Sequence, residues 1–397
     1  MMSGQVVLLE GLRQTAVRHE VPARSVRPSR STTDQDYGIQ DAAASCLGSP
    51  TNGRLHCGRE PSLTSHRHER ATPKANRQYI GSMPQKLDWR STWPDSPVLP
   101  PDPSARYGEG HERAIVISGG GLAGLAWGSA YLNGLVSAGI DLSTADLVVG
   151  TSAGSLLGTE LLAKDLGNFH RAFQLAAKSH IFEHIRNDDD PKPSAAHARA
   201  LFDDADNGDP ETLLAIGHAA LAAEAPSQYS LFAQMALFVR RLRWPSPALR
   251  TTAYDAYTAE RHVYSKGGKA HLLHALAASA SVPGLMEPVR IGGRRLMDGG
   301  MRSGANSDIA VGADRALVIG LVHDPRQGKW TNAPGQWDSE IADLEAAGTR
   351  LHTQLPAEDL GDPMDATALP LGLRLGAEQA AEDAAAITEF WAADPQR

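Results

Sequence analysis

Two short apolar runs, each leading into a glycine-rich turn and a helical pattern, constrain the fold of this chain most strongly. The first, "RAIVIS" (113–118), precedes three consecutive glycines and apolar residues at helical spacing over 122–139. The second, "ADLVVG" (145–150), precedes the helical pattern of 152–167. Continuous β-branched runs are typical of buried strands, and their alternation with helices indicates parallel pairing. We therefore expect an α/β fold with a central, mostly parallel sheet flanked by helices on both faces.

The rest of the chain extends this pattern. A helical insertion is expected at about 165–248, where polar breaks separate the apolar stretches. The later elements follow in order: two short strands (249–268), a helix ended by Pro283 and Gly284 (271–289), a hairpin ending on Asp298, a buried strand (315–322) and a C-terminal amphipathic helix (376–393). These elements predict a single α/β domain over residues 113–395, of a size common for catalytic domains.

The first part of the chain differs in composition. Residues 1–82 are rich in Arg, Ser, Thr, Pro and His and have no sustained period, which predicts a disordered tail. The sequence from Met83 onward resembles an ordinary N-terminus. A second interpretation is therefore that residues 1–82 are upstream sequence that is not translated. Residues 83–112 form a Pro-rich approach segment to the domain.

Composition narrows the classes of function. The net charge of −8 gives no general attraction to nucleic acid, so no nucleic-acid partner is expected. Both cysteines, Cys46 and Cys57, precede the domain, which argues against a disulfide framework or a thiolate metal site. The first residues lack a secretory signal, so a cytoplasmic location is expected. The charge-free stretch 114–140 contains seven glycines and is interpreted as strand, loop and helix, not as a transmembrane segment.

The motif "GTSAG" (150–154) places one hydroxyl, that of Ser152, between Gly150 and Gly154 at the end of a buried strand. A sharp strand-to-helix corner of this kind can present a nucleophile above a sheet. Small residues at the same positions also simply allow a helix to pack closely against its strand. The motif alone does not separate these two interpretations.

Two further segments supply the groups that acyl transfer requires. "SGGGLAG" (118–124) can direct successive backbone N–H groups into a hollow at a helix N-terminus, as an oxyanion requires. "MDGG" (297–300) places the carboxylate of Asp298 at the end of a predicted strand, followed by glycines that permit a sharp turn.

In combination and in this order, the segments resemble the patatin-like phospholipase family. The resemblance runs from about residue 114 to residue 322 and rests on four segments: "GGGLAG" (119–124), "GTSAG" (150–154), "ALAASASVPGLMEPV" (275–289) and "DGG" (298–300). It implies a three-layer α/β architecture and hydrolysis of ester-linked acyl chains from phospholipid or neutral glycerolipid. It implies no metal and no organic cofactor.

The resemblance also implies roles for particular residues. Ser152 matches the nucleophile and Asp298 the base of a Ser–Asp dyad that has no catalytic histidine. The oxyanion loop corresponds to Gly119, Gly120 and Gly121, with Ala153 as a further donor. The remaining motif glycines are Gly124, Gly150, Gly154, Gly299 and Gly300.

This chain departs from the family pattern at two places. Ala123 stands where the family often has Arg or Lys, which removes a positive charge near the expected acyl or head-group site. After "DGG", the longer segment "MRSGANSDIA" replaces a compact Asn-x-Pro ending, with Asn306 as the candidate for the asparagine role. The segment "SLFAQMALFVRRLRWP" (230–245) is placed to border the acyl pocket or to contact a lipid surface, and its basic end suits transient contact with a membrane surface. For that basic end, an amphipathic core helix is the favoured interpretation.

Three alternatives remain open at this point. A Ser–His–Asp esterase would use His323, which follows the predicted strand 315–322. A nucleotide-dependent oxidoreductase would explain the glycine loop, but the second strand does not end in the acidic residue that should hold a ribose. A non-catalytic lipid-binding relative would keep the fold without the reaction. His271 and His274 lack further ligands for a metal site, and "NDDD" (187–190) lacks calcium-loop spacing.

Overall fold

The computed structural model describes residues 98–179, 191–206, 208–236, 238–325 and 334–392. The tail at 1–82, most of the approach segment and "NDDD" (187–190) lie outside these described residues. The strands are β1 (Arg113–Ile117), β2 (Leu147–Gly150), β3 (Leu249–Asp255), β4 (Arg261–Tyr264), β5 (Val289–Ile291), β6 (Arg294–Met297), β7 (Arg315–Ile319) and β8 (Arg350–Gln354). The helices are α2 (Gly121–Ser137), α3 (Ala153–Leu162), α4 (Leu166–Ser179), α6 (Pro193–Asp203), α7 (Pro210–Ala222), α8 (Gln228–Ala236), α9 (Leu272–Ser279), α10 (Gln336–Ala346) and α11 (Leu369–Ala392).

These strands form one mixed sheet in the order β5-β6-β3-β2-β1-β7-β8, with β4 paired to β3. Five neighbouring strands in this order run parallel: β3, β2, β1, β7 and β8. The remaining strands are joined by antiparallel pairing, β4 and β6 to β3, and β5 to β6. The expectation of a mostly parallel α/β sheet is therefore confirmed. Because neighbouring parallel strands end at the same edge, the turns after β1 and β2 are brought together.

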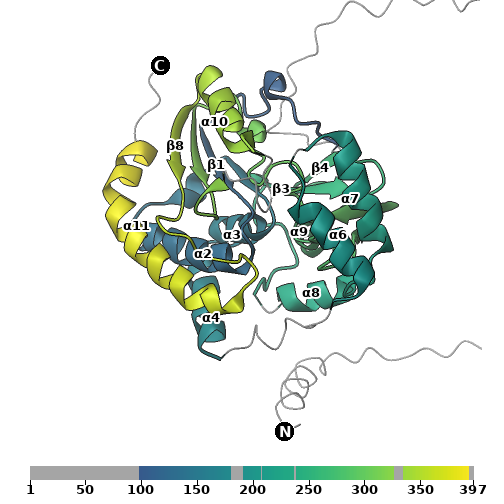
Figure 1. The fold of residues 1–397 in the computed structure, drawn as a ribbon. Helices are drawn as coiled ribbons and strands as arrows, with labels where there is room; N and C mark the ends of the chain where they lie inside the picture. The colour runs from purple at the N-terminus through teal and green to yellow at the C-terminus, as the bar shows by residue number, and fades with distance from the viewer. Residues whose placement is uncertain (1–97, 180–190, 207, 237, 326–333, 393–397) are drawn as a thin grey trace, which may run out of the picture. The chain divides into compact units, whose positions relative to one another are not determined.

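Alternate residues of the central strands enter two different hydrophobic clusters. Ile115 and Ile117 of β1 pack with α2, α3, α9 and α11, whereas Ala114 and Val116 pack with α10 and the 3-10 turn η3 (Ser307–Ala310). Helices thus cover both faces of the sheet, as in a three-layer α/β protein. In Figure 1, α11 runs along α2, and α6, α7 and α8 gather beside α9 and β3.

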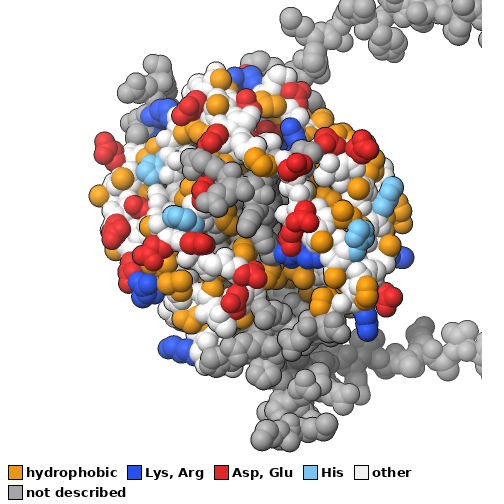
Figure 2. All heavy atoms as spheres, in the orientation of Figure 1, with side chains coloured by type: hydrophobic (Ala, Val, Ile, Leu, Met, Phe, Trp, Pro, Cys, Tyr) orange, Lys and Arg blue, Asp and Glu red, His pale blue; other side chains and the backbone are white. Residues whose placement is uncertain are grey.

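The charge-free stretch 114–140 is strand, loop and helix, in agreement with its interpretation from sequence. β1 is buried along four of its five residues, and α2 is buried along most of its length. Across the described residues, no helix combines the length and apolar character needed to cross a bilayer. On the face shown in Figure 2, acidic side chains are scattered widely and the Lys and Arg side chains lie dispersed among them.

Candidate active site

Ser152 occupies a strained corner between β2 and α3. Its φ of 50° and ψ of −119° lie in a region that non-glycine residues rarely adopt, at a cost on the order of 1–3 kcal/mol. The corner is fixed by hydrogen bonds on both sides: the Ser152 N–H donates to Ser279 Oγ at 2.9 Å, and the Ser152 carbonyl accepts from the Ser155 N–H at 2.9 Å. The surrounding structure therefore holds the Ser152 hydroxyl in one place at the edge of the sheet.

The glycines flanking Ser152 are required by close packing. A Cβ at Gly150 would lie 2.6 Å from Gly154 O, and a Cβ at Gly154 would collide with Ile117 O and Ser118 O. The structure thus supports the close-packing interpretation drawn from the sequence. The small residues allow α3 to lie against β1 and β2, next to the strained conformation at Ser152.

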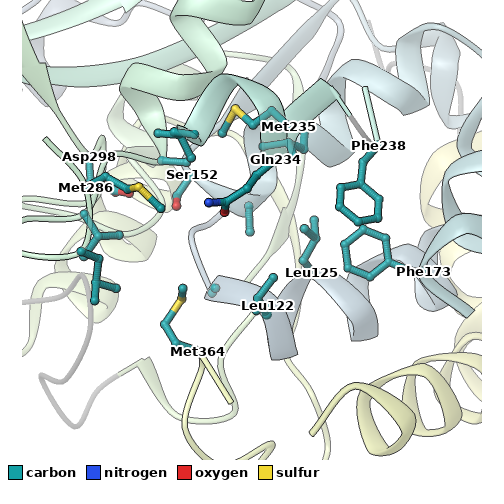
Figure 3. A pocket seen from close by; sticks show the side chains of 18 of the residues that line it. Leu122, Leu125, Ser152, Phe173, Gln234, Met235, Phe238, Met286, Asp298 and Met364 are labelled. Atoms are coloured by element: carbon teal, nitrogen blue, oxygen red, sulfur yellow. The ribbon is translucent and has the colours of Figure 1, made fainter. Parts of the chain in front are cut away.

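Asp298 follows β6 and is almost fully buried, with 1% of its surface exposed. Its N–H donates to Ser281 O at 2.9 Å, and its Oδ1 accepts from the Gly300 N–H at 2.7 Å. Its Oδ2 has no partner with good hydrogen-bond geometry among the described residues, which leaves it available on the side of Ser152. Figure 3 shows the two side chains next to each other at one end of a pocket.

Burial raises the pKa of Asp298 to about 7. The Gly300 N–H, the Ser152 hydroxyl and the charge of Arg199 each lower this pKa, but together they do not offset the loss of water around the carboxylate. A carboxyl group with a pKa near neutrality can both take and return a proton at physiological pH.

The glycine loop between β1 and α2 contributes backbone donors. Gly120 and Gly121 line the pocket together with Ala153. Gly120 caps α2, and Ala153 is the first residue of α3, so their N–H groups lie at helix N-termini, where backbone donors have no intrahelical partner. Gly121 has a φ of 61° and leaves no room for a Cβ beside Pro363 O.

Gly119 has a different position. Its N–H donates to Gly304 O at 2.8 Å, and it does not line the pocket. This hydrogen bond ties the glycine loop to the segment after Asp298. Gly124 lies within the first turn of α2, where a Cβ would meet Leu321 O at 2.5 Å. Gly299 likewise has no room for a Cβ beside Thr252.

Asn306 links the two halves of the site. Its Nδ2 donates to Thr151 Oγ1 at 3.1 Å, next to Ser152, and to Gly299 O at 3.0 Å, next to Asp298. Its Oδ1 accepts from Arg261, whose guanidinium also forms a bidentate pair with Asp308 at 2.6 and 2.7 Å. Arg261, Asn306 and Asp308 are all buried, so this network fixes Asn306 without contacting the pocket.

Sequence reasoning missed Ser279. Its Oγ accepts from the Ser152 N–H, and its carbonyl accepts from the Gly299 N–H at 3.1 Å. One residue at the end of α9 therefore contacts both the Ser152 corner and the turn that follows Asp298. The signal was present in the run "ALAASASVPG", whose small residues permit such close contacts, but nothing in the run distinguishes Ser279 from Ser281.

The Ser152 hydroxyl faces a cavity of about 140 Å³ that opens to solvent. Four of its lining residues come from the segment after residue 230 that sequence analysis had linked to the acyl pocket or a lipid surface: Leu231, Gln234, Met235 and Phe238. The basic end of that segment is partly paired, because Arg241 lies 2.9 Å from Asp165 and 3.5 Å from Glu160. The rest of the lining is mainly aliphatic and aromatic: Leu122, Leu125, Leu156, Phe173, Phe202, Ala280, Val282, Leu285, Met286 and Met364.

His323 lines a second cavity, on the other side of Gly120. Its Nδ1 lies 2.8 Å from Pro356 O, and its neighbours around this cavity include Asp324, Asp359 and Asp362. Neither Ser152 nor Asp298 lines this cavity. Among the described residues, no group of three or more His, Cys, Asp or Glu side chains is arranged to hold a metal ion.

These features define a class of protein: a mostly parallel α/β domain with an apolar pocket, a strained serine and a buried aspartate at the carboxyl ends of its strands. A family model described as patatin-like phospholipase matches residues 115–311, which include the glycine loop, Ser152, Asp298 and Asn306. Through this segment the chain belongs to the patatin-like phospholipase family, whose general activity is lipid acyl hydrolysis.

Two further comparisons complete this result. VipD from Legionella pneumophila is a similar solved structure, with a TM-score of 0.34 and 11% sequence identity over 70% of this chain and 67% of that chain. No curated protein matches the sequence.

Proposed function

We propose that this protein hydrolyses acyl esters of lipids through a dyad formed by Ser152 and Asp298. The observation that carries the proposal is the position of Asp298: a buried carboxylate with a pKa of about 7, facing the hydroxyl of a strained serine at the end of an apolar cavity. An aspartate with a purely structural role would be expected to have an ion-pair partner at such a buried position, because burial of an unpaired charge is costly.

In the first half of the reaction, the Ser152 oxygen attacks the ester carbonyl carbon while Asp298 Oδ2 takes the hydroxyl proton. The carbonyl oxygen becomes negatively charged and accepts hydrogen bonds from the backbone N–H groups of Gly120, Gly121 and Ala153. When the bond to the alcohol breaks, protonated Asp298 returns its proton to the leaving oxygen, and the acyl group stays on Ser152.

In the second half, water replaces the alcohol. Asp298 takes a proton from the water as its oxygen attacks the acyl carbon, and then returns that proton to the Ser152 oxygen as the fatty acid leaves. The apolar cavity holds the acyl chain and excludes other water from the reacting atoms. Gly119 has a positioning role in this mechanism, because its N–H holds the loop to Gly304.

The experiment that tests the proposal compares wild type with Ser152→Ala and Asp298→Asn by covalent labelling with a fluorophosphonate and by release of fatty acid from phospholipid and glycerolipid vesicles. Wild type should label at Ser152 and release fatty acid, and both variants should lose at least about a thousandfold in rate. His323→Ala is the matched control, and it should retain activity. Loss of activity in His323→Ala would favour a Ser–His–Asp esterase, and a folded wild type that neither labels nor hydrolyses would favour a non-catalytic lipid-binding protein.

We further propose that the protein reaches its substrate by transient contact with a membrane surface. The exposed Leu242 and the arginines beside it support this, because apolar and basic side chains together favour anionic lipid surfaces. Co-sedimentation with anionic and neutral vesicles, comparing wild type with Leu242→Asp, tests this contact.

A further inference from the structure

The cavity beside Ser152 contains one polar side chain that the proposed mechanism does not use. Among the described residues that line it, only Ser152, Gln234 and Asp298 have polar side chains. The first and third belong to the dyad. Gln234 therefore stands alone as a hydrogen-bonding group in a wall of aliphatic and aromatic residues.

Gln234 lies on α8 between two apolar lining residues of the same helix, Leu231 and Met235. It is half-buried, and its Nε2 donates a long hydrogen bond of 3.3 Å to Ser230 Oγ. No described residue bonds its carbonyl oxygen or its second N–H. In Figure 3, its amide points into the cavity on the side of Ser152, whereas Phe173 and Phe238 lie beyond it.

An amide in this position discriminates between substrates. When an acyl ester fills the cavity, it displaces the water that hydrates Gln234. A plain hydrocarbon at that point leaves the carbonyl oxygen and the second N–H of the amide without partners, which is unfavourable, whereas a hydroxyl or ester oxygen restores a hydrogen bond. Because an amide both donates and accepts, it can bond either kind of oxygen.

We propose that Gln234 is a specificity-determining residue that hydrogen-bonds an oxygen-bearing group adjacent to the scissile ester of the substrate. The inference rests on the proposed function and goes beyond it by naming the class of substrate. The oxygen belongs either to the acyl chain, as in a β-hydroxyacyl ester, or to the alcohol, as in a monoacylglycerol with free hydroxyls. Simple alkyl esters of unsubstituted fatty acids are poorer substrates than the class that carries this oxygen.

The test uses two pairs of esters with the full-length protein. The acyl pair is para-nitrophenyl octanoate and para-nitrophenyl β-hydroxyoctanoate, and the alcohol pair is propyl octanoate and monooctanoylglycerol. For each pair, kcat/KM is measured for wild type, Gln234→Leu and Gln234→Met. Met235→Leu is the matched control, because it changes the neighbouring lining residue without removing a hydrogen-bonding group.

The readout is the ratio of kcat/KM within a pair, compared between variants, so that intrinsic differences in ester reactivity cancel. The ratio is the kcat/KM for the hydroxylated ester divided by that for the unsubstituted ester. We expect Gln234→Leu and Gln234→Met to lower this ratio by at least about tenfold in one pair, and Met235→Leu to leave it unchanged. The pair that responds identifies the source of the oxygen.

An unchanged ratio in both pairs for both Gln234 variants would overturn the assignment while leaving the dyad standing, provided that Ser152 still labels with fluorophosphonate. A folded wild type that neither labels nor hydrolyses any of the four esters would overturn the proposed function and this inference together.

Discussion

The backbone N–H of Ser152 donates to the hydroxyl of Ser279 at 2.9 Å, so the end of α9 fixes the corner that carries Ser152, the proposed nucleophile. The carbonyl of Ser279 accepts from the Gly299 N–H at 3.1 Å, next to Asp298, the proposed base. Ser279 is fully buried and does not line the pocket. We propose that it is a positioning residue, which sets where Ser152 and Asp298 stand relative to each other without contacting substrate.

Replacement of Ser279 by Ala should therefore affect the reaction as well as the fold. The Ser152 N–H loses its acceptor in a buried place, which should lower the free energy of unfolding by about 1–2 kcal/mol. Because the strained corner is then less well held, kcat should fall by about tenfold with little change in KM. The control is Ser281→Ala, which removes a buried hydroxyl bonded to Glu287 O but not to Ser152. Equal losses of kcat in the two variants would argue against the positioning role.

The raised pKa of Asp298 predicts the pH dependence of activity. The base must be ionised to accept the Ser152 proton, so kcat/KM should rise with pH and level off above a midpoint of about 7. Initial rates of ester hydrolysis between pH 5 and 9 check this midpoint. Since a histidine would give a similar curve, the profile is repeated for His323→Ala, and a displaced midpoint there would assign the titration to His323.

The same pKa predicts an unusual effect of Asp298→Asn on stability. The pKa of the carboxyl lies near 7 in the folded protein and at 3.8 in the unfolded chain, so the folded state holds the proton more tightly. The contribution of Asp298 to folding stability should fall as pH rises from about 4 to about 7, because the carboxyl is ionised in the unfolded chain over this range and folding must take up a proton.

Removing the charge should therefore stabilise the protein at pH 8, by on the order of 1–3 kcal/mol, and the gain should disappear toward pH 4. Urea denaturation at several pH values measures it. Asp308→Asn provides the contrast, because its carboxylate pairs with buried Arg261, and breaking such a pair should cost about 3–5 kcal/mol at pH 8. A destabilised Asp298→Asn at pH 8 would contradict the predicted penalty.

The aromatic end of the cavity predicts control over acyl-chain length. Phe173 and Phe238 pack with ring centroids 4.8 Å apart, and both line the cavity. Phe173→Leu should enlarge the cavity at this end and shift the preference toward longer acyl chains, with about a fourfold gain in kcat/KM for each additional methylene that becomes buried. Hydrolysis of a series of para-nitrophenyl esters measures the shift. Phe169→Leu, on the same helix but lining a different cavity, should not produce it.

The close packing at the serine corner predicts a large difference between two glycine substitutions. A Cβ at Gly154 would collide with the carbonyl oxygens that follow β1, so Gly154→Ala should destabilise the protein by about 2–3 kcal/mol or more. Gly293, in the hairpin between β5 and β6, has nothing within 4 Å of the corresponding position and does not require a positive φ. Gly293→Ala should change the free energy of unfolding by less than about 0.5 kcal/mol, as urea denaturation will show.

Much of the fold was predictable because its central elements are buried. The runs that became β1, β2 and β7 are apolar apart from the arginine that begins β1 and β7, and such continuous patterns identify strands covered on both faces. Two elements were not predicted. β8 lies at the edge of the sheet, and its sequence "RLHTQ" is mixed and only partly buried. α10 buries few residues, so its apolar spacing is weak. The predicted helix at 271–289 ends at Ser279, ahead of Pro283.

The sequence by itself determined which chemical groups this protein has and which turns carry them: Ser152 on a glycine corner, Asp298 after a strand, and a glycine loop before a helix. These are local properties, set by residues a few positions apart. Only the tertiary structure decided that Asp298 faces Ser152, that burial raises its pKa, that the Gly119 N–H is used by Gly304, and that Ser279 and Asn306 join the two halves of the site. The physical reason is that desolvation and long-range hydrogen bonds depend on which distant segments the sheet brings together, and local sequence does not encode those distances.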